Sequence, residues 1–187
     1  VSPNLAQGLV LGLEALARKS GGDLLSDQAK DQLVIMLRYR SADELTAARV
    51  RALALSTLRH AEALTERYVD ESLRDPDPDV RRIAAASLDL VPPSLRTELT
   101  RRALGDRTLR VSIEALRQLA DDPSNALRCQ WLDIAAGKTN MRPIRVLALE
   151  ALGEPCPDVA AQQQTLMDAV SEIGATTDSE WLAPARA

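Results

Sequence analysis

The feature that most constrains this chain is a turn followed at once by a helix, Asp75 to Leu88. Pro76 and Pro78 stop any preceding helix, because proline lacks the amide hydrogen that a helix interior needs. Asp77 stands where a helix cap is expected, and Pro78 suits the first helical position. The small and apolar residues that follow share one helical stripe, which comprises Val80, Ile83, Ala84, Ser87 and Leu88. The stretch therefore predicts a helix that packs against a neighbour.

Weaker copies of this unit occur on both sides of it. The shared pattern is an apolar residue followed by Arg, a small residue three positions further on, and Leu four after that. Three helices match in full: Val50-Arg51-Ala54-Leu58, Val80-Arg81-Ala84-Leu88 and Ile144-Arg145-Ala148-Leu152. Two match in part: Thr108-Leu109-Ser112-Leu116, with its Arg one place late, and Gly8-Leu9-Gly12-Leu16, without Arg. The Leu residues recur every 28 to 42 residues, a period that with two helices per unit is typical of an α-solenoid.

Composition also favours helices alone. The chain has no Phe and is 2% aromatic, whereas Ala and Leu are abundant. Sheets and ordinary globular cores rely on large rings and β-branched residues, but Ala and Leu suit closely packed helices. The sequence therefore predicts an all-α fold.

The first expected helix begins after Pro3 and extends to Lys19. Its apolar stripe is predicted to comprise Leu5, Leu9, Leu13 and Leu16. Gly8 and Gly12 lie inside this helix, where each glycine costs about 1 kcal/mol relative to Ala. We therefore expect them to allow the close approach of a neighbouring helix.

On these residues the chain resembles the HEAT-repeat family, in particular the short bacterial repeats related to those of phycobilisome lyases. The resemblance covers residues 4–174 and is strongest at Asp75 to Leu88. It implies a right-handed α-α superhelix of about five helical pairs in residues 1–174. Residues 175–187 are then the start of a further, truncated helix or a tail.

In this family an Asp in the turn inside a repeat pairs with the Arg that begins the second helix, which forms a ladder between neighbouring repeats. The resemblance implies that Asp77 or Asp79 takes part in such a ladder, with Arg51, Arg81 and Arg145 as the cations. These residues are expected to be structural.

The resemblance further implies that the Arg-bearing helices, at 43–59, 78–90, 107–120 and 141–152, line an inner concave surface. The positions left over from packing there are Arg59, Arg82, Asp89, Arg110, Glu114 and Arg117. The net charge is −4, yet residues 81–117 carry 8 basic and 4 acidic side chains. We therefore expect an Arg-rich stripe that binds an acidic or carboxylate-bearing protein partner. The competing interpretation is a solvated face whose Arg stems cover apolar surface.

The residue types that support catalysis are sparse. His60 is the only histidine, so neither a His-based triad nor a two-His metal site can form. The clustered carboxylates, at 75–79 and 121–122, precede expected helices, where capping explains them. No Gly-rich phosphate loop is present. The sequence predicts a non-enzymatic protein without cofactor or metal.

Cys129 and Cys156 are too few for a disulfide framework or a zinc site, so we expect two buried thiols in a reducing compartment. No apolar run reaches the roughly 20 residues of a bilayer span, and no signal peptide is visible. We therefore expect no membrane contact and a cytoplasmic location. The chain stops at Ala187 inside a predicted helix, which suggests a module of a larger protein.

The predicted function is a non-catalytic scaffold that binds another protein through its concave face. The alternative is a HEAT-like nucleic-acid-binding protein, or a relative of the DNA glycosylases, that uses the Arg-rich middle. That alternative requires a strongly positive groove with aromatic rings for stacking. The chain is net acidic and has two Trp and two Tyr, so nucleic acid is the less favoured partner.

Overall fold

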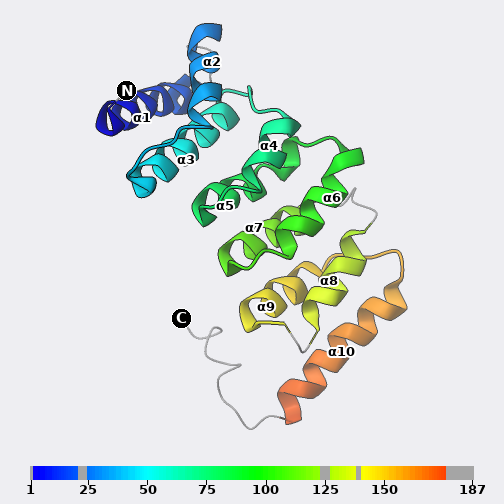
Figure 1. Ribbon diagram of the computed structural model, residues 1–187. Coiled ribbons are helices and arrows are strands. Elements are labelled where there is room, and N and C mark those ends of the chain that lie inside the picture. Colours follow the sequence, from blue (N-terminus) through cyan, green and yellow to red (C-terminus); the bar gives the residue numbers. More distant parts are fainter. Residues whose placement is uncertain (1, 21–24, 123–126, 138–139, 176–187) are drawn as a thin grey trace. The chain divides into compact units, whose positions relative to one another are not determined.

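The computed structural model describes residues 2–20, 25–122, 127–137 and 140–175, and its regular secondary structure there is entirely helical (Figure 1). The all-α prediction is thus confirmed for the described ranges. The predicted terminal helix or tail lies outside them from residue 176 onward. Two compact units make up the chain: an N-terminal unit, residues 1–122, and a C-terminal unit, residues 123–187. None of the described helices combines the length and hydropathy needed to cross a bilayer.

Helices of the N-terminal unit alternate between two layers (Figure 1). In the first layer each helix packs on the next, in the order α1 (Pro3–Ser20), α3 (Glu44–His60), α5 (Pro78–Ala86) and α7 (Leu109–Ala120). In the second layer α2 (Asp27–Met36) packs on α3, α4 (Glu66–Ser72) on α5, and α6 (Pro93–Leu104) on α7. A short 3-10 turn, η1 (Leu88–Leu90), follows α5. The buried apolar core lies between the layers.

The local structure of α5 is the one that the sequence predicts. The Asp77 carboxylate accepts hydrogen bonds from the amides of Asp79 and Val80 at 2.9 and 3.3 Å, and Pro78 occupies the first turn. Val80 and Ala84 are buried against the neighbouring helices. The cap satisfies amides that have no partner inside the helix. The start of α5 is therefore determined locally, by residues 77–79.

Helix α1 buries a different face from the predicted one. Its buried residues are Ala6, Val10, Glu14 and Ala17, whereas Leu5, Leu9 and Leu16 are 66%, 47% and 44% exposed. A Cβ atom added at Gly8 or at Gly12 would meet nothing within 4 Å. The prediction that these glycines admit a neighbouring helix of the chain is therefore wrong. Both stripes have helical spacing, so periodicity by itself could not choose between them.

The C-terminal unit contains α8 (Arg128–Ala136), α9 (Arg142–Ala151) and α10 (Val159–Ala175), and α8 packs on both of the others. Cys129 on α8 and Cys156 before α10 form a disulfide with an S–S distance of 2.06 Å. The prediction of two free thiols is therefore wrong. The partners are 27 residues apart, and they meet because α9 folds back on α8. Since disulfides persist mainly in oxidising environments, the cysteines no longer argue for a reducing compartment.

The disulfide is expected to stabilise the C-terminal unit, because it closes a loop of 27 residues and so restricts the unfolded chain. Replacing both cysteines by alanine should lower the free energy of unfolding of this unit by about 3–4 kcal/mol. Hydrogen–deuterium exchange should then accelerate at the amides of α8 and α9. The amides of α3 and α5 are the internal control, and their exchange should stay unchanged. Equal protection of α9 with and without the disulfide would contradict this prediction.

Candidate interaction groove

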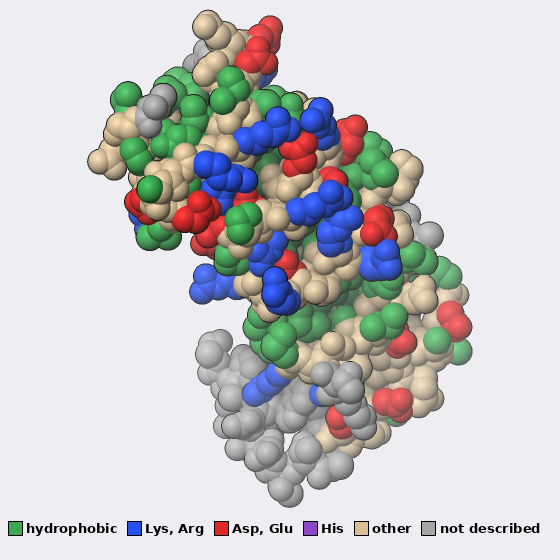
Figure 2. Space-filling model, viewed as in Figure 1, with side chains coloured by type: hydrophobic (Ala, Val, Ile, Leu, Met, Phe, Trp, Pro, Cys, Tyr) green, Lys and Arg blue, Asp and Glu red, His purple; other side chains and the backbone are tan. Residues whose placement is uncertain are grey.

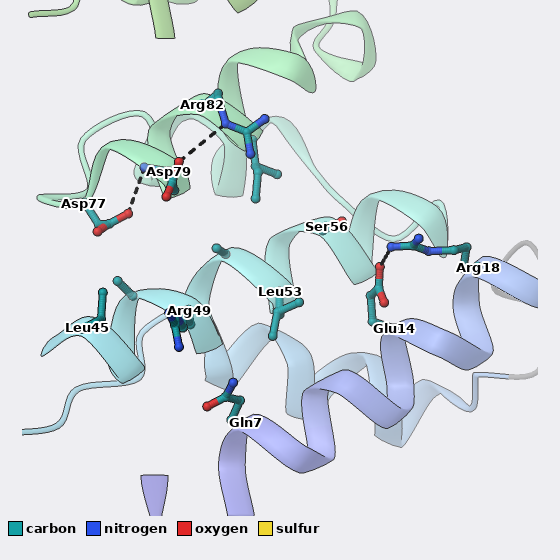
Figure 3. A pocket seen from close by; sticks show the side chains of 13 residues that line it. Gln7, Glu14, Arg18, Leu45, Arg49, Leu53, Ser56, Asp77, Asp79 and Arg82 are labelled. Atoms are coloured by element: carbon teal, nitrogen blue, oxygen red, sulfur yellow. Dashed lines mark hydrogen bonds and ion pairs between the residues drawn. The ribbon is translucent and has the colours of Figure 1, made fainter. Parts of the chain in front are cut away.

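A groove of about 510 Å³ lies over α3, with α1 on one side and α5 on the other (Figure 3). The residues of α3 form its floor: Leu45, Ala48, Arg49, Ala52, Leu53 and Ser56. Helix α1 contributes Gln7, Glu14 and Arg18, and the start of α5 contributes Asp77, Asp79, Arg82 and Ile83. The floor is therefore mainly apolar and the rim is charged.

Two guanidinium groups of the groove are accessible to a partner. Arg49 is exposed and, among the described residues, makes no ion pair. Arg82 lies 3.7 Å from Asp79, and its side chain is 40% exposed. Arg18, by contrast, pairs with Glu14 one helical turn away. Arg49 also contributes to the lowered pKa of Asp43, whose main cause is the hydrogen bond from the Thr46 hydroxyl.

The structure distributes the six predicted concave-face residues over α3, α5, η1 and α7: Arg59, Arg82, Asp89, Arg110, Glu114 and Arg117. Arg82 lines the groove. Arg59 pairs with Asp89 at 3.3 Å, and Arg117 pairs with Glu114 at 3.4 Å. Arg110 is exposed and has no ion pair within the described part of the chain. The two carboxylates of the set thus pair with two of its four cations, which leaves Arg82 and Arg110 without a partner inside the set.

The Arg-rich middle of the chain is partly explained by other pairs. Arg96 donates to Asp122 at 2.7 Å. On α6, Arg101 pairs with Glu98, and Arg102 pairs with Asp70 of α4. Figure 2 shows the resulting mixture of basic and acidic side chains over α4 and α6. These arginines belong to the second layer, so they add nothing to the groove.

Two Arg–carboxylate pairs, one buried and one partly buried, connect helices that form the groove. Arg51 of α3 is fully buried, and it donates to Asp75 from Nε at 2.8 Å and from Nη2 at 3.0 Å. It also donates to Glu44 at 2.7 Å and to the Tyr39 carbonyl at 3.1 Å. Arg51 thereby ties α3 to the turn that precedes α5. We call this contact and its copy at Arg81 the ladder.

Arg81 of α5 makes the same kind of contact with the turn that precedes α7. It donates to Asp106 from Nε at 2.7 Å and from Nη2 at 3.1 Å, and to the carbonyls of Asp75 and Pro76 at 2.8 and 2.9 Å. Asp106 lies in the turn before α7. Each bidentate pair has two parallel hydrogen bonds, which fix an orientation as well as a distance. The two pairs therefore fix the positions of α3, α5 and the turn before α7 relative to one another.

The predicted cations of the ladder are correct for Arg51 and Arg81, but the predicted carboxylates are wrong. Asp77 caps α5, and Asp79 pairs with Arg82. The acceptors are instead Asp75 and Asp106.

The two acceptors, Asp75 and Asp106, share a local sequence signal. The Asp75 carboxylate also accepts from the Asp77 amide at 2.9 Å, and the Asp106 carboxylate accepts from the Thr108 amide at 2.8 Å. In both turns an Asp bonds the amide two residues on, directly before a helix, which is the pattern of an Asx turn. The signal is thus an Asp placed two residues before the N-cap.

In the C-terminal unit Arg145 finds different partners. It donates to the Ala136 carbonyl at 3.1 Å and to Glu172 of α10 at 2.6 Å. The carboxylate of Glu172 therefore comes from a helix, whereas Asp75 and Asp106 lie in turns.

The ladder pairs shift the pKa values of their members. Burial acts to raise the pKa of Asp106, but the hydrogen bonds from Arg81 and Thr108 outweigh it, so this pKa is lowered. The hydrogen bond to Asp106 is the main cause of the raised pKa of Arg81. For Arg51, burial lowers the pKa, and the hydrogen bonds to Asp75 and Glu44 more than offset it. Asp106 is therefore held in its charged form by the fold.

Among the residues considered for chemistry, Asp77 and Asp79 line the rim of the groove, whereas His60 is not part of its lining. His60 is exposed at the end of α3, and its Nδ1 lies 2.7 Å from the Ser56 carbonyl oxygen. Within the described ranges no three His, Cys, Asp or Glu side chains are grouped closely enough to hold a metal ion.

Comparison with known proteins gives no match to a family model, to a curated protein or to a solved structure. The groove and the ladder are therefore interpreted from their own geometry.

Replacing Arg51 by alanine should leave the carboxylate of Asp75, which is 7% exposed, without its cation. Breaking a buried pair in this way is expected to lower the free energy of unfolding by about 3–5 kcal/mol. The matched control is Arg101→Ala, which removes an exposed pair on α6 and should cost less than about 1 kcal/mol. Urea denaturation of both variants measures the difference. Equal losses would show that the ladder contributes no more than a surface pair.

The lowered pKa of Asp106 predicts how stability responds to acid. Because the folded pKa lies below the unfolded value of about 3.9, the contribution of Asp106 is complete above that pH and is lost as the pH falls through the folded pKa. Asp106→Asn should therefore reduce stability at neutral pH and make it less dependent on pH in the acid range. Urea midpoints at neutral and acid pH test this, with Glu98→Gln on the exposed face of α6 as control. An unchanged acid slope in Asp106→Asn would exclude the assignment.

Proposed function

We propose that this chain is a non-enzymatic protein-binding module, in which the N-terminal unit is a HEAT-like right-handed α-α superhelix and the groove over α3 receives a segment of another protein. The observation that carries the proposal is the combination of an apolar floor with two accessible guanidinium groups, Arg49 and Arg82, in a groove of about 510 Å³.

Two observations support the superhelix. The first-layer helices pack in chain order, and each second-layer helix packs on the first-layer helix that follows it. The ladder then repeats the same contact in successive units, from Arg51 to Asp75 and from Arg81 to Asp106. Repeated helical pairs that contact only their neighbours are the physical basis of a solenoid.

The groove favours an amphipathic segment as the occupant. Leu45 is 63% exposed, and together with Leu53 and Ile83 it offers apolar surface to a leucine-like side chain. Arg49 and Arg82 favour a carboxylate beside that side chain, because a guanidinium can bind it through two hydrogen bonds. Helical ligands place such residues three or four positions apart. The partner is therefore proposed to be an acidic amphipathic helix.

Nucleic acid fits the described surface less well. The cations on α1 and α5 are accompanied by Glu14, Asp77 and Asp79 within the same groove. Phosphates would meet these carboxylates, whereas nucleic-acid grooves are strongly positive.

Selection from a displayed library of short helical peptides tests the proposal. The chain is expected to enrich peptides in which Asp or Glu lies three or four residues from Leu. Arg49→Glu with Arg82→Glu should weaken their binding at least about tenfold, because both charges then repel the peptide. Arg101→Glu, an exposed position on α6, is the matched control and should bind normally.

A second variant locates the binding surface. Arg110→Glu with Arg117→Glu changes the α7 part of the predicted stripe and leaves the groove intact. Loss of binding in this variant alone would move the site from the groove to α7. No enrichment of acidic amphipathic peptides would overturn the proposal, and a salt-sensitive shift of DNA at low salt would support the alternative.

A further inference from the structure

An outward face of α1 is apolar and uncovered by the rest of the described chain. Leu5, Leu9 and Leu16 are 66%, 47% and 44% exposed, and Gly8 and Gly12 lie among them on the same side of the helix. We call these five residues the leucine face. Figure 2 shows hydrophobic side chains gathered over α1. The groove-lining residues of α1, such as Gln7 and Glu14, belong to the opposite side of the helix.

The leucine face has the composition of an interface core. Residues 3–13 include no charged side chain, although 27% of the chain is charged. Depletion of charge is what distinguishes the buried centre of protein interfaces from ordinary surface.

Among the described residues, nothing explains why glycine occupies positions 8 and 12. Each costs about 1 kcal/mol relative to alanine within a helix. A Cβ at either position would meet nothing within 4 Å, so neither glycine makes room for another part of the described chain. Each one leaves a notch on the surface, flanked by an exposed leucine. Such notches allow a second helix to approach closely.

We infer that the leucine face binds a second copy of this chain, with the two α1 helices packed antiparallel about a two-fold axis. When this axis runs between the two α1 helices, level with the Val10–Leu11 peptide bond, each residue i lies opposite residue 21 − i of the other copy. Leu9 of each copy then lies over the notch at Gly12 of the other, and Leu5 lies opposite Leu16. A two-fold interface requires such reciprocal contacts. The face is self-complementary in this one arrangement.

Charge selects the antiparallel orientation over the parallel one. Arg18 and Lys19 are the basic residues in the last turn of α1, and its first turn has no charged side chain. Parallel packing would bring these cations of both copies together, whereas antiparallel packing places them at opposite ends. The helix dipoles also attract each other when they are antiparallel. Because the groove opens on the other side of α1, this dimer leaves it free, and the inference does not depend on the proposed function.

Sedimentation velocity over the micromolar range tests the dimer. The natural chain should shift from monomer to dimer as its concentration rises. Leu9→Glu should weaken the dimer at least about tenfold, because it buries a charge at the centre of the interface. Leu11→Glu is the matched control: it lies on the same helix, is 44% exposed and falls outside the leucine face. This control should dimerise like the natural chain.

A third variant distinguishes specific helix packing from non-specific hydrophobic association. Gly12→Leu fills the notch that Leu9 of the other copy enters, so it should weaken the dimer, even though it adds apolar surface. Non-specific hydrophobic association would instead become stronger. Circular dichroism confirms that each variant keeps its helices. The inference is overturned if the natural chain stays monomeric at all concentrations, if Leu9→Glu still forms the dimer, or if Gly12→Leu tightens it.

Discussion

The geometry of the N-terminal unit depends on a buried guanidinium of α3 bound to a carboxylate in the turn before α5. Arg51 is fully buried, a position that a charge occupies only when each of its nitrogens has a hydrogen-bond acceptor. Asp75, Glu44 and the Tyr39 carbonyl supply that match. Packing of Ala and Leu is non-directional, but a bidentate pair has one geometry. The ladder therefore determines the relative orientation of α3 and α5, and with it the width of the groove.

Charge on the first-layer helices has two different uses. Some arginines serve the fold, as Arg81 does with Asp106, or pair across the same face, as Arg59 does with Asp89. Others, Arg49 and Arg82, stand at an apolar floor where a partner can reach them. A count of basic residues along the sequence merges these uses. Their partners in space separate the two uses, and this separation is the reason that the proposed recognition surface lies nearer to α3 than to α7.

Helix α1 shows how a single element can serve two surfaces. One side packs on α3 and lines the groove, and the other side exposes leucines and glycines. The amphipathic pattern of its sequence is double: Ala6, Val10 and Ala17 form one stripe, and Leu5, Leu9 and Leu16 form another. The first stripe is buried within the molecule, and the larger leucines of the second stripe remain exposed.

The sequence by itself determined the all-helical fold, through its composition and helical spacing, and the cap and start of α5, through residues within a few positions of one another. The two arginines of the ladder were implied by the family resemblance. Tertiary structure alone decided two other features: the buried face of α1 and the Cys129–Cys156 bond. Both depend on which distant residues come within contact distance. Helical periodicity and residue spacing describe only neighbours along the chain, so they could not select among partners that meet through folding.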